Sequence, residues 1–273
     1  MERAFLFGQD RDLVGIVNEP DGQACDKNMP IVILLNAGLV HHVGPFRMNV
    51  EFARSLSNQG VLSFRFDLSG IGDSNQHKDS RSNEEKILGD IKSAMDFLSS
   101  KYDVDRFILL GLCTGADNAH KAAVLDKRVV GAVFLDGYVY PTTGYYMRHY
   151  GPRFFSPKVW FNKLKALFSS NKEVLSVQDN DYFWVLPPKN KVETELKGLV
   201  ERNVGLMYIF SGGYVEYNYL NQFNDMYSAV DFQDKLHIEY FPRADHTYIL
   251  GDDRKKLIDC VCTWVDSRYS KGA

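Results

Sequence analysis

Five residues near the middle of the chain, Gly111-Leu112-Cys113-Thr114-Gly115, have the types and spacing to do chemistry. Apolar residues 107–110 before them predict a buried strand, and alanine-rich residues 116–125 after them predict a helix. Glycines on both sides of Cys113 allow a turn so tight that the middle residue is strained and its side chain projects from the sheet. The helix dipole and the free N–H groups of the first helical turn favour a thiolate there. The pattern predicts Cys113 as a nucleophile, with a packed core cysteine as the alternative.

A nucleophilic thiol needs a base within proton-transfer reach, and His246 has the surroundings that suit this role. It stands in a loop between the last predicted strand and the last predicted helix, where Pro242 and polar neighbours disfavour a core position. His77, His149 and His237 fall in segments that look like surface or strand, and His120 falls on the predicted helix behind the cysteine. The Cys113 and His246 pair predicts acyl transfer, in which the thiolate attacks a carbonyl carbon and the imidazole moves the protons.

Strand patterns alternate with helical patterns along most of the chain, which predicts a mainly parallel sheet with helices on both faces. An antiparallel hairpin is expected in residues 4–19. Further strands are expected at 31–35, 61–66, 107–110, 129–135, 205–210 and 235–241, and helices at 48–59, 83–100, 116–125, 219–231 and 252–269. Residues 138–203 are rich in aromatic side chains and contain no strong strand pattern, so we interpret them as an inserted lid. Residues 1–137 and 204–273 would then form the core domain.

Four segments occur in the order and spacing of one large family. They are Asn36-Ala37-Gly38 after the third strand, residues 67–74 after the fourth, the glycine-flanked Cys113, and Ala244-Asp245-His246 near the end. Over nearly its whole length the chain resembles the α/β-hydrolase superfamily, which implies a mostly parallel central sheet, helices on both faces and an inserted lid. Two positions depart from the family pattern. Cysteine stands where most members have serine, and Asn36 stands where a histidine is common.

The resemblance implies an acidic residue that orients His246, but several positions compete for this role. The acid usually follows the strand after the lid, which points to Glu216. Some members place it one strand earlier, where Asp136 ends a predicted strand. Asp225, or a cysteine–histidine dyad without an acid, completes the alternatives. Asp245 adjoins the histidine, and we expect it to shape the loop.

The resemblance also implies an oxyanion hole made of backbone N–H groups. One would come from Thr114, directly after the nucleophile, and the other from Gly38 or Leu39 in the loop after the third strand. The same loop continues with an unusual concentration of polar residues. His42 and Arg47 are candidates to bind a carboxylate or phosphate of the substrate, or else they form hydrogen bonds within the loop and at the helix entry.

Composition excludes several classes of protein. With 273 residues, of which 45% are hydrophobic, the chain can bury a full core. A net charge of -3 and the lack of a basic stripe argue against a nucleic-acid partner. No secretory start or membrane-length apolar run is present, so we expect a cytoplasmic protein with no membrane span. Cys260 and Cys262 point to different faces of a predicted helix and cannot share a metal ion, and we expect no cofactor and no metal.

An acyl-cysteine is a thioester, which water, alcohols and amines can all attack. The sequence therefore predicts a hydrolase of an ester or thioester, acting on a small-molecule or carrier-bound acyl substrate. An acyltransferase that passes the acyl group to an alcohol or amine is the alternative, and a non-catalytic binding protein on the same fold is the second. The aromatic lid favours a bulky apolar acyl group. The oligomeric state is left open.

Overall fold

The computed structural model describes residues 1–20, 27–154 and 186–270, and its centre is an eight-stranded sheet in the order β1-β2-β4-β3-β5-β6-β7-β8. The strands are β1 (Glu2–Phe7), β2 (Leu13–Asn18), β3 (Ile31–Leu34), β4 (Ser63–Phe66), β5 (Phe107–Leu112), β6 (Val129–Leu135), β7 (Gly205–Ser211) and β8 (Leu236–Phe241). The first two strands form the predicted antiparallel hairpin, and β2 joins β4 antiparallel. Each later pair is parallel. The predicted mostly parallel sheet is confirmed.

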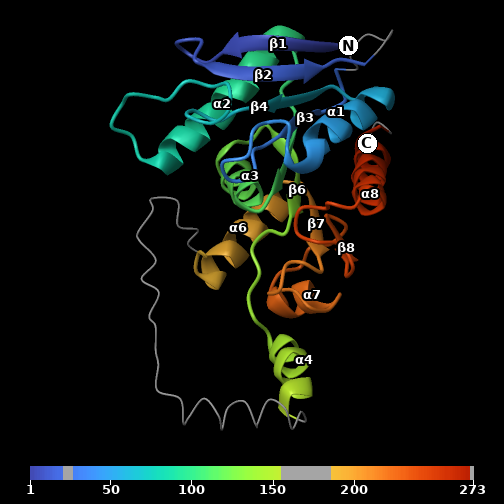
Figure 1. The fold of residues 1–273 in the computed structure, drawn as a ribbon. Coiled ribbons are helices and arrows are strands. Elements are labelled where there is room, and N and C mark those ends of the chain that lie inside the picture. Colours follow the sequence, from blue (N-terminus) through green and yellow to red (C-terminus); the bar gives the residue numbers. More distant parts are fainter. Residues whose placement is uncertain (21–26, 155–185, 271–273) are drawn as a thin grey trace, which may run out of the picture.

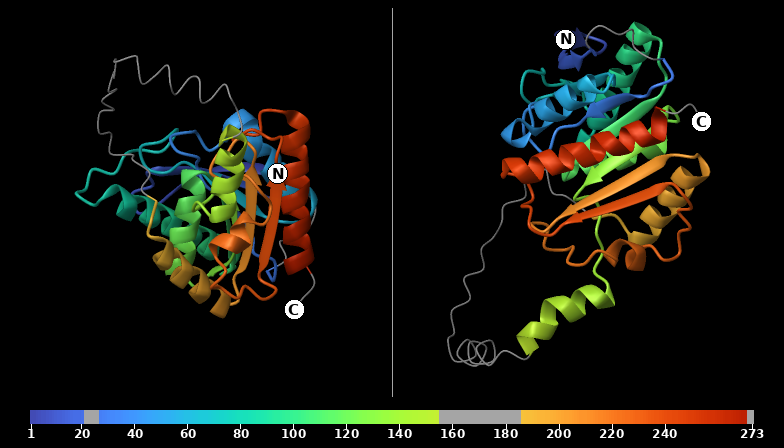
Figure 2. Two further views of the ribbon diagram at one scale, coloured as in Figure 1. Left: turned by 90° about the horizontal axis from the view of Figure 1, so that it is seen from below. Right: turned by 90° about the vertical axis from the view of Figure 1, so that its right-hand side faces the viewer.

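Helices cover both faces of this sheet. The helices α1 (Met48–Asn58) and α8 (Gly251–Tyr269) lie on one face. On the other lie α2 (Asn83–Tyr102), α3 (Thr114–Leu125) and α6 (Lys189–Glu201), as Figures 1 and 2 show. Alternate residues of β3 enter the two cores: Ile31 and Ile33 pack on the α2 and α3 side, and Val32 and Leu34 pack on the α1 and α8 side. A strand buried on both faces is apolar throughout, which is why its sequence shows no alternation.

The sequence overestimated one helix. Only α7 (Gln222–Met226) forms within the predicted helix 219–231. The chain before it is held in turns by side chains: the Tyr217 hydroxyl donates to the Leu220 carbonyl, and Gln222 bonds both the Asn218 N–H and the Glu216 carbonyl. These local bonds, together with the burial of Tyr217 and Phe223, compete with a continuous helix.

The predicted lid, residues 138–203, contains two described helices with different settings. The helix α4 (Thr143–Phe154) stands away from the sheet in Figure 1. Its start is tied to the chain after β7, because Thr142 Oγ1 lies 2.7 Å from the Tyr219 hydroxyl. By contrast, α6 places Val192 and Leu196 in the main core beside α3. Residues 155–185 of the predicted lid lie outside the described residues, so the lid stays a prediction.

The described residues contain no helix that is both long and apolar enough to cross a membrane.

Candidate active site

Cys113 occupies a strained turn between β5 and α3. Its backbone has φ 56° and ψ −121°, a conformation that residues other than glycine rarely adopt. The two glycines on either side of it leave no room for a side chain. A Cβ atom on Gly111 would lie 2.1 Å from the backbone of Gly115, and one on Gly115 would lie 2.5 Å from the Asn36 carbonyl oxygen. The turn is thus packed against the end of β3, and the structure maintains strain at a residue able to act as a nucleophile.

His246 joins the cysteine to a buried carboxylate. Its Nδ1 lies 2.7 Å from Oδ2 of Asp136, and its ring also interacts with the thiol of Cys113. Asp136 directly follows β6, has a positive φ of 50° and is 3% exposed. Its two carboxylate oxygens accept hydrogen bonds from the N–H and the hydroxyl of Ser211, each 2.7 Å long, at the end of β7. The carboxylate therefore has a fixed orientation toward the imidazole.

These contacts favour the charged form of His246. The hydrogen bonds to Asp136 and to Cys113 outweigh the opposing effect of burial and raise the pKa of His246 from 6.5 to about 10. At neutral pH the imidazole is therefore protonated and stands between two acidic groups.

The loop of His246 is supported by a pair of glycines after β7. Gly212 N–H donates to the Phe241 carbonyl at 2.9 Å, and Gly213 N–H donates to the Ala244 carbonyl at 3.0 Å. A Cβ atom on Gly213 would lie 2.3 Å from the backbone nitrogen of His246, so only glycine allows this approach. Asp245 accepts hydrogen bonds from the N–H groups of residues 247 and 249, which confirms the prediction that it shapes the loop.

Glu216, the acid favoured from the sequence, lies elsewhere. It is exposed, and among the described residues its carboxylate makes no hydrogen bond to His246. The chain after β7 instead places Tyr214 against the imidazole, with ring centroids 6.0 Å apart, and Glu216 follows two residues later at the surface. Asp225 is engaged with Tyr219 and with Asn221. Of the acids considered, the structure brings the alternative, Asp136, to the histidine.

Ser211 is the site residue that sequence reasoning missed. It is fully buried and gives both of its hydrogen-bond donors to Asp136. The only signal was a small hydroxyl residue at the end of a buried strand, at the place where the usual acid of the superfamily would follow. Such a signal does not identify its partner, because Asp136 is 75 positions away.

The loop after β3 meets the elbow through one hydrogen bond. Gly38 N–H donates to Oγ1 of Thr114 at 2.7 Å, with Gly38 in a left-handed conformation at φ 56°. This N–H is therefore occupied by a side chain. The backbone N–H of Leu39 makes no hydrogen bond within the described part of the chain. Thr114 is the first residue of α3, where a backbone N–H has no acceptor within the helix.

Residues 28–197 match the sequence model of the Hydrolase_4 family, described as serine aminopeptidase, S33. The chain belongs to this family. No curated protein sequence matches it.

Solved structures that resemble this hydrolase share its fold over their whole length. Est1E of Butyrivibrio proteoclasticus, solved with ferulic acid, is 15% identical with a TM-score of 0.61, and the match covers 95% of this chain and 96% of that one. Proline iminopeptidase of Mycobacterium smegmatis is 13% identical with a TM-score of 0.58, and 98% of each chain is covered. The putative α/β hydrolase ATU1826 of Agrobacterium tumefaciens is 16% identical with a TM-score of 0.58, over 98% and 96%. These likenesses confirm the α/β-hydrolase fold. The family is named for serine enzymes, so Cys113 distinguishes this hydrolase from the family description.

In the hydrolase, the loop that carries Gly38 and Leu39 is fixed by the buried Asp67. One carboxylate oxygen accepts from Asn36 Nδ2 at 3.0 Å and from the His42 N–H at 2.6 Å, and the other lies 2.7 Å from His42 Nδ1. Burial opposes the charged form of Asp67, but the hydrogen bonds from His42, from the Asp73 N–H and from Asn36 hold its pKa below the usual value.

His42 is thus engaged inside the loop. It is buried and its imidazole faces Asp67, which agrees with the alternative of loop hydrogen bonds, and a role in anion binding stays a prediction. The physical reason is that a fully buried carboxylate needs N–H donors, and His42 supplies two of them. Arg47 is exposed in a left-handed conformation at φ 65°, and among the described residues its guanidinium has no partner.

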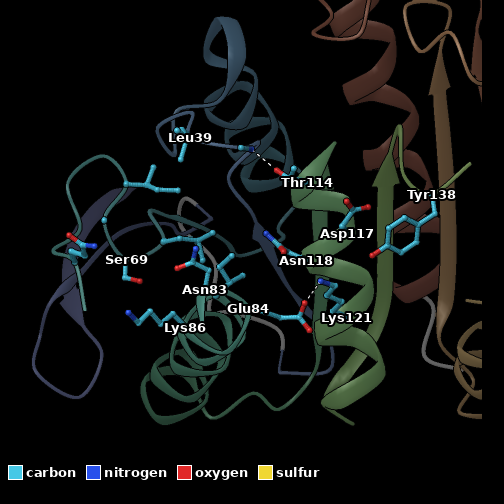
Figure 3. A pocket seen from close by; sticks show the side chains of 16 residues that line it. Leu39, Ser69, Asn83, Glu84, Lys86, Thr114, Asp117, Asn118, Lys121 and Tyr138 are labelled. Carbon is cyan, nitrogen blue, oxygen red and sulfur yellow. Dashed lines mark hydrogen bonds and ion pairs between the residues drawn. The ribbon is translucent and has the colours of Figure 1, made fainter. Parts of the chain in front are cut away.

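A cavity of about 410 Å³ opens beside the elbow of the hydrolase, between α3 and the start of α2 (Figure 3). Its wall near the elbow includes Leu39 and Thr114. Further away the lining is mixed. Leu68, Ile71 and Ile87 supply apolar surface, and Asn83, Lys86, Asp117 and Asn118 supply polar or charged groups. The position and lining of this cavity suit a small molecule with polar groups.

Proposed function

We propose that this α/β hydrolase cleaves an ester or a thioester through an acyl-enzyme formed on Cys113. One observation carries the proposal: a thiol on a strained elbow is paired with His246, which is held in turn by the buried Asp136. A strained backbone conformation destabilises the folded chain, and such strain is typically found where a residue takes part in chemistry. A structural cysteine needs neither the strain nor the buried carboxylate behind its histidine.

The first step follows from these contacts. The Cys113 thiolate attacks the carbonyl carbon of the substrate, and the carbonyl oxygen becomes an oxyanion. His246, protonated at neutral pH, gives its proton to the leaving alcohol or thiol as the tetrahedral intermediate collapses to the acyl-cysteine. Neutral His246 then removes a proton from water, and the resulting hydroxide attacks the thioester. The acid leaves, and the thiolate and imidazolium are restored.

We assign the oxyanion hole to the backbone N–H groups of Leu39 and Thr114. Gly38, the other candidate in the loop, already donates its N–H to the hydroxyl of Thr114. That bond instead positions the loop, so that the next N–H stands beside the elbow. Thr114 thus serves twice in this proposal, through its backbone as a donor and through its side chain as the anchor of the loop.

The cavity beside the elbow supports an acyl group that carries polar substituents. Lys86 and Asn118 line it together with Ile71 and Ile87, so a long unbranched alkyl chain would leave charged and amide groups without partners. This differs from the bulky apolar group that the aromatic residues 138–203 favoured. Arg47, exposed and unpaired in the described structure, remains the candidate for a carboxylate or phosphate of the substrate. We keep the lid, residues 138–203, as part of this proposal.

Intact-protein mass spectrometry tests the proposal. The wild-type chain is mixed with a panel of acyl thioesters and aryl esters and quenched in acid within seconds. We expect a mass increase equal to the acyl group, located by peptide mapping on Cys113, and release of the free acid. Cys113→Ala should show neither, and Cys260→Ala serves as the matched control that keeps both. Turnover that survives in Cys113→Ala, or an acyl group on another residue, would reject the mechanism.

The same experiment distinguishes hydrolysis from transfer. An alcohol or a primary amine is added with the substrate, and the products are separated by chromatography. Free acid as the main product supports the hydrolase, whereas an ester or amide formed faster than the acid would assign the chain as an acyltransferase. Cys113→Ala is the blank in both assays.

A further inference from the structure

Two groups of potential metal ligands exist among the described residues, and only one of them has free coordination capacity. In each group the candidate ligand atoms lie within 4.8 Å of one another. The first contains His41, His42, Asp67 and Asp73 in the loop next to the elbow. Both oxygens of Asp67 already accept hydrogen bonds from backbone N–H groups and side chains, so an ion there would have to break the loop's own network.

The second group is formed by His237, Glu239 and Cys260, away from the elbow. His237 and Glu239 are two positions apart on β8, so their side chains emerge on the same face of the strand. The helix α8 brings Cys260 to them. Cys262, two positions further on the helix, is 1% exposed and packs in the core. A nitrogen, an oxygen and a sulfur donor are thus collected from two regular elements that the core holds in place.

The present contacts of these three residues leave them able to bind. His237 Nε2 lies 2.9 Å from Glu239 Oε1, and both side chains are more than a third exposed. Cys260 is half-buried, and its sulfur lies beside a histidine and a carboxylate that can rotate toward it.

We propose that His237, Glu239 and Cys260 form a binding site for Zn²⁺ or a similar borderline transition-metal ion. Ligands of one tetrahedral zinc ion stand about 3.5 Å apart, so the three donors need only small side-chain rotations. On binding, the Cys260 thiol releases its proton to solvent and a sulfur–metal bond forms. His237 donates the lone pair of Nε2 and keeps its proton on Nδ1, and Glu239 donates a carboxylate oxygen. Water fills the fourth position. The thiolate selects against Mg²⁺ and Ca²⁺, which prefer oxygen ligands.

Such an ion would fasten the last strand of the sheet to the last helix. Among the described strands, β8 has a neighbour only on the β7 side, and its end leads directly into the loop of His246. An ion that binds the folded chain more tightly than the unfolded chain stabilises the fold by mass action. The site is structural, and it stands or falls independently of the acyl-enzyme proposal.

Titration with Co²⁺ provides a direct readout, because a thiolate ligand gives Co²⁺ an intense near-ultraviolet charge-transfer absorption. Reduced, chelator-treated protein of the Cys113→Ser variant is used, so that the elbow thiol does not contribute. We expect saturation at one ion per chain, loss of the absorption when Zn²⁺ is added, and a Zn²⁺-dependent rise in Tm.

Three variants assign the ligands. The absorption should disappear in Cys260→Ala and persist in Cys262→Ala, its matched control on the same helix. His237→Asn and Glu239→Gln change exposed side chains, so these variants should fold normally and bind Co²⁺ at least about tenfold more weakly. The proposal is overturned if the starting protein shows no charge-transfer absorption at stoichiometric Co²⁺, or if the absorption survives in Cys260→Ala. Unchanged affinity in both His237→Asn and Glu239→Gln would overturn it as well.

Discussion

Asp136 and His246 are 110 positions apart in the chain and are joined by a 2.7 Å contact between Oδ2 and Nδ1. The contact exists because β6 and β8 flank β7, and the chain after each strand bends toward the same point. Ser211, at the end of the strand between them, fixes the carboxylate by donating two hydrogen bonds to it. Three neighbouring strand ends thus hold a carboxylate against an imidazole. In the proposed mechanism, this pair forms a relay that determines the charge on the imidazole.

Replacing the carboxylate by an amide should disable the relay without removing its shape. We expect Asp136→Asn to lower kcat by about 10³- to 10⁴-fold, because the imidazole loses the partner that sets its tautomer and stabilises its positive charge. Glu216→Gln is the matched control and should retain kcat within about twofold. Steady-state hydrolysis of an aryl ester measures both. Equal losses in the two variants would contradict the assignment of Asp136.

The pH dependence should be shifted far to the alkaline side for a histidine. With a pKa of about 10, His246 stays protonated and can protonate a leaving group well above neutrality. We expect kcat/KM to stay level from neutral pH to about pH 9 and to fall above it. In Asp136→Asn the main cause of the raised pKa is gone, so the fall should begin at lower pH. A wild-type alkaline fall centred near pH 7 would contradict this.

The same shift affects stability with a defined sign. The pKa of His246 is higher in the folded chain than the unfolded value of 6.5, so its protonation stabilises the fold. The contribution is complete below about pH 6.5 and is lost as the pH rises toward 10. Urea unfolding at pH 6 and pH 9.5 should therefore show a smaller loss of free energy for His246→Gln than for wild type. Parallel losses in the two proteins would refute the linkage.

The hydroxyl of Thr114 should matter to turnover more than to binding. Thr114→Val keeps the shape of the side chain but removes the acceptor of the Gly38 N–H, which frees the loop that carries Leu39. We expect kcat to fall by about 10- to 100-fold with little change in KM, since an oxyanion donor acts mainly in the transition state. Thr114→Ser restores the acceptor and should retain most of the activity. A rise in KM alone would indicate a substrate contact instead.

Removal of Asp67 should destabilise the protein strongly. Asp67→Ala leaves the Asn36 amide, two backbone N–H groups and the His42 ring without their acceptor, at a cost of about 3–5 kcal/mol. Because the pKa of Asp67 is lowered in the folded chain, wild type should also lose this support as the pH falls below 3.8. Asp245→Ala, which removes a half-buried loop acceptor, should cost about 1 kcal/mol. Urea unfolding compares the two variants.

The fold could be predicted, and Cys113 and His246 could be proposed as reacting groups, because their signals are local. A buried strand, a glycine-flanked cysteine and a helix follow one another within twenty residues, and α2 begins at Asn83 as its pattern indicated. The identity of the acid could not be obtained this way. Glu216 and Asp136 both follow strands, and the choice depends on how Gly212 and Gly213 bend the chain, which is a matter of packing.

His42 and Cys260 illustrate the same limit. From the sequence, a polar loop beside the proposed active site resembles a ligand site. In the structure, His42 of this loop supplies hydrogen-bond donors to the buried Asp67 carboxylate. The sequence pairs Cys260 only with Cys262 on the same helix, whereas the potential ligands near it, His237 and Glu239, come from another element. The spacing of residues within one element does not predict which side chains of another element they contact.

Cys113 and Asp136 both precede the long stretch between β6 and α6, and His246 returns only after the last strand. The groups proposed to carry out the reaction are therefore all attached to the sheet, and none belongs to the residues between Gly137 and α6. Evolution can lengthen, shorten or replace that stretch while leaving the proton relay intact. In a scaffold organised like this, the range of compounds accepted and the reaction performed on them are free to diversify separately.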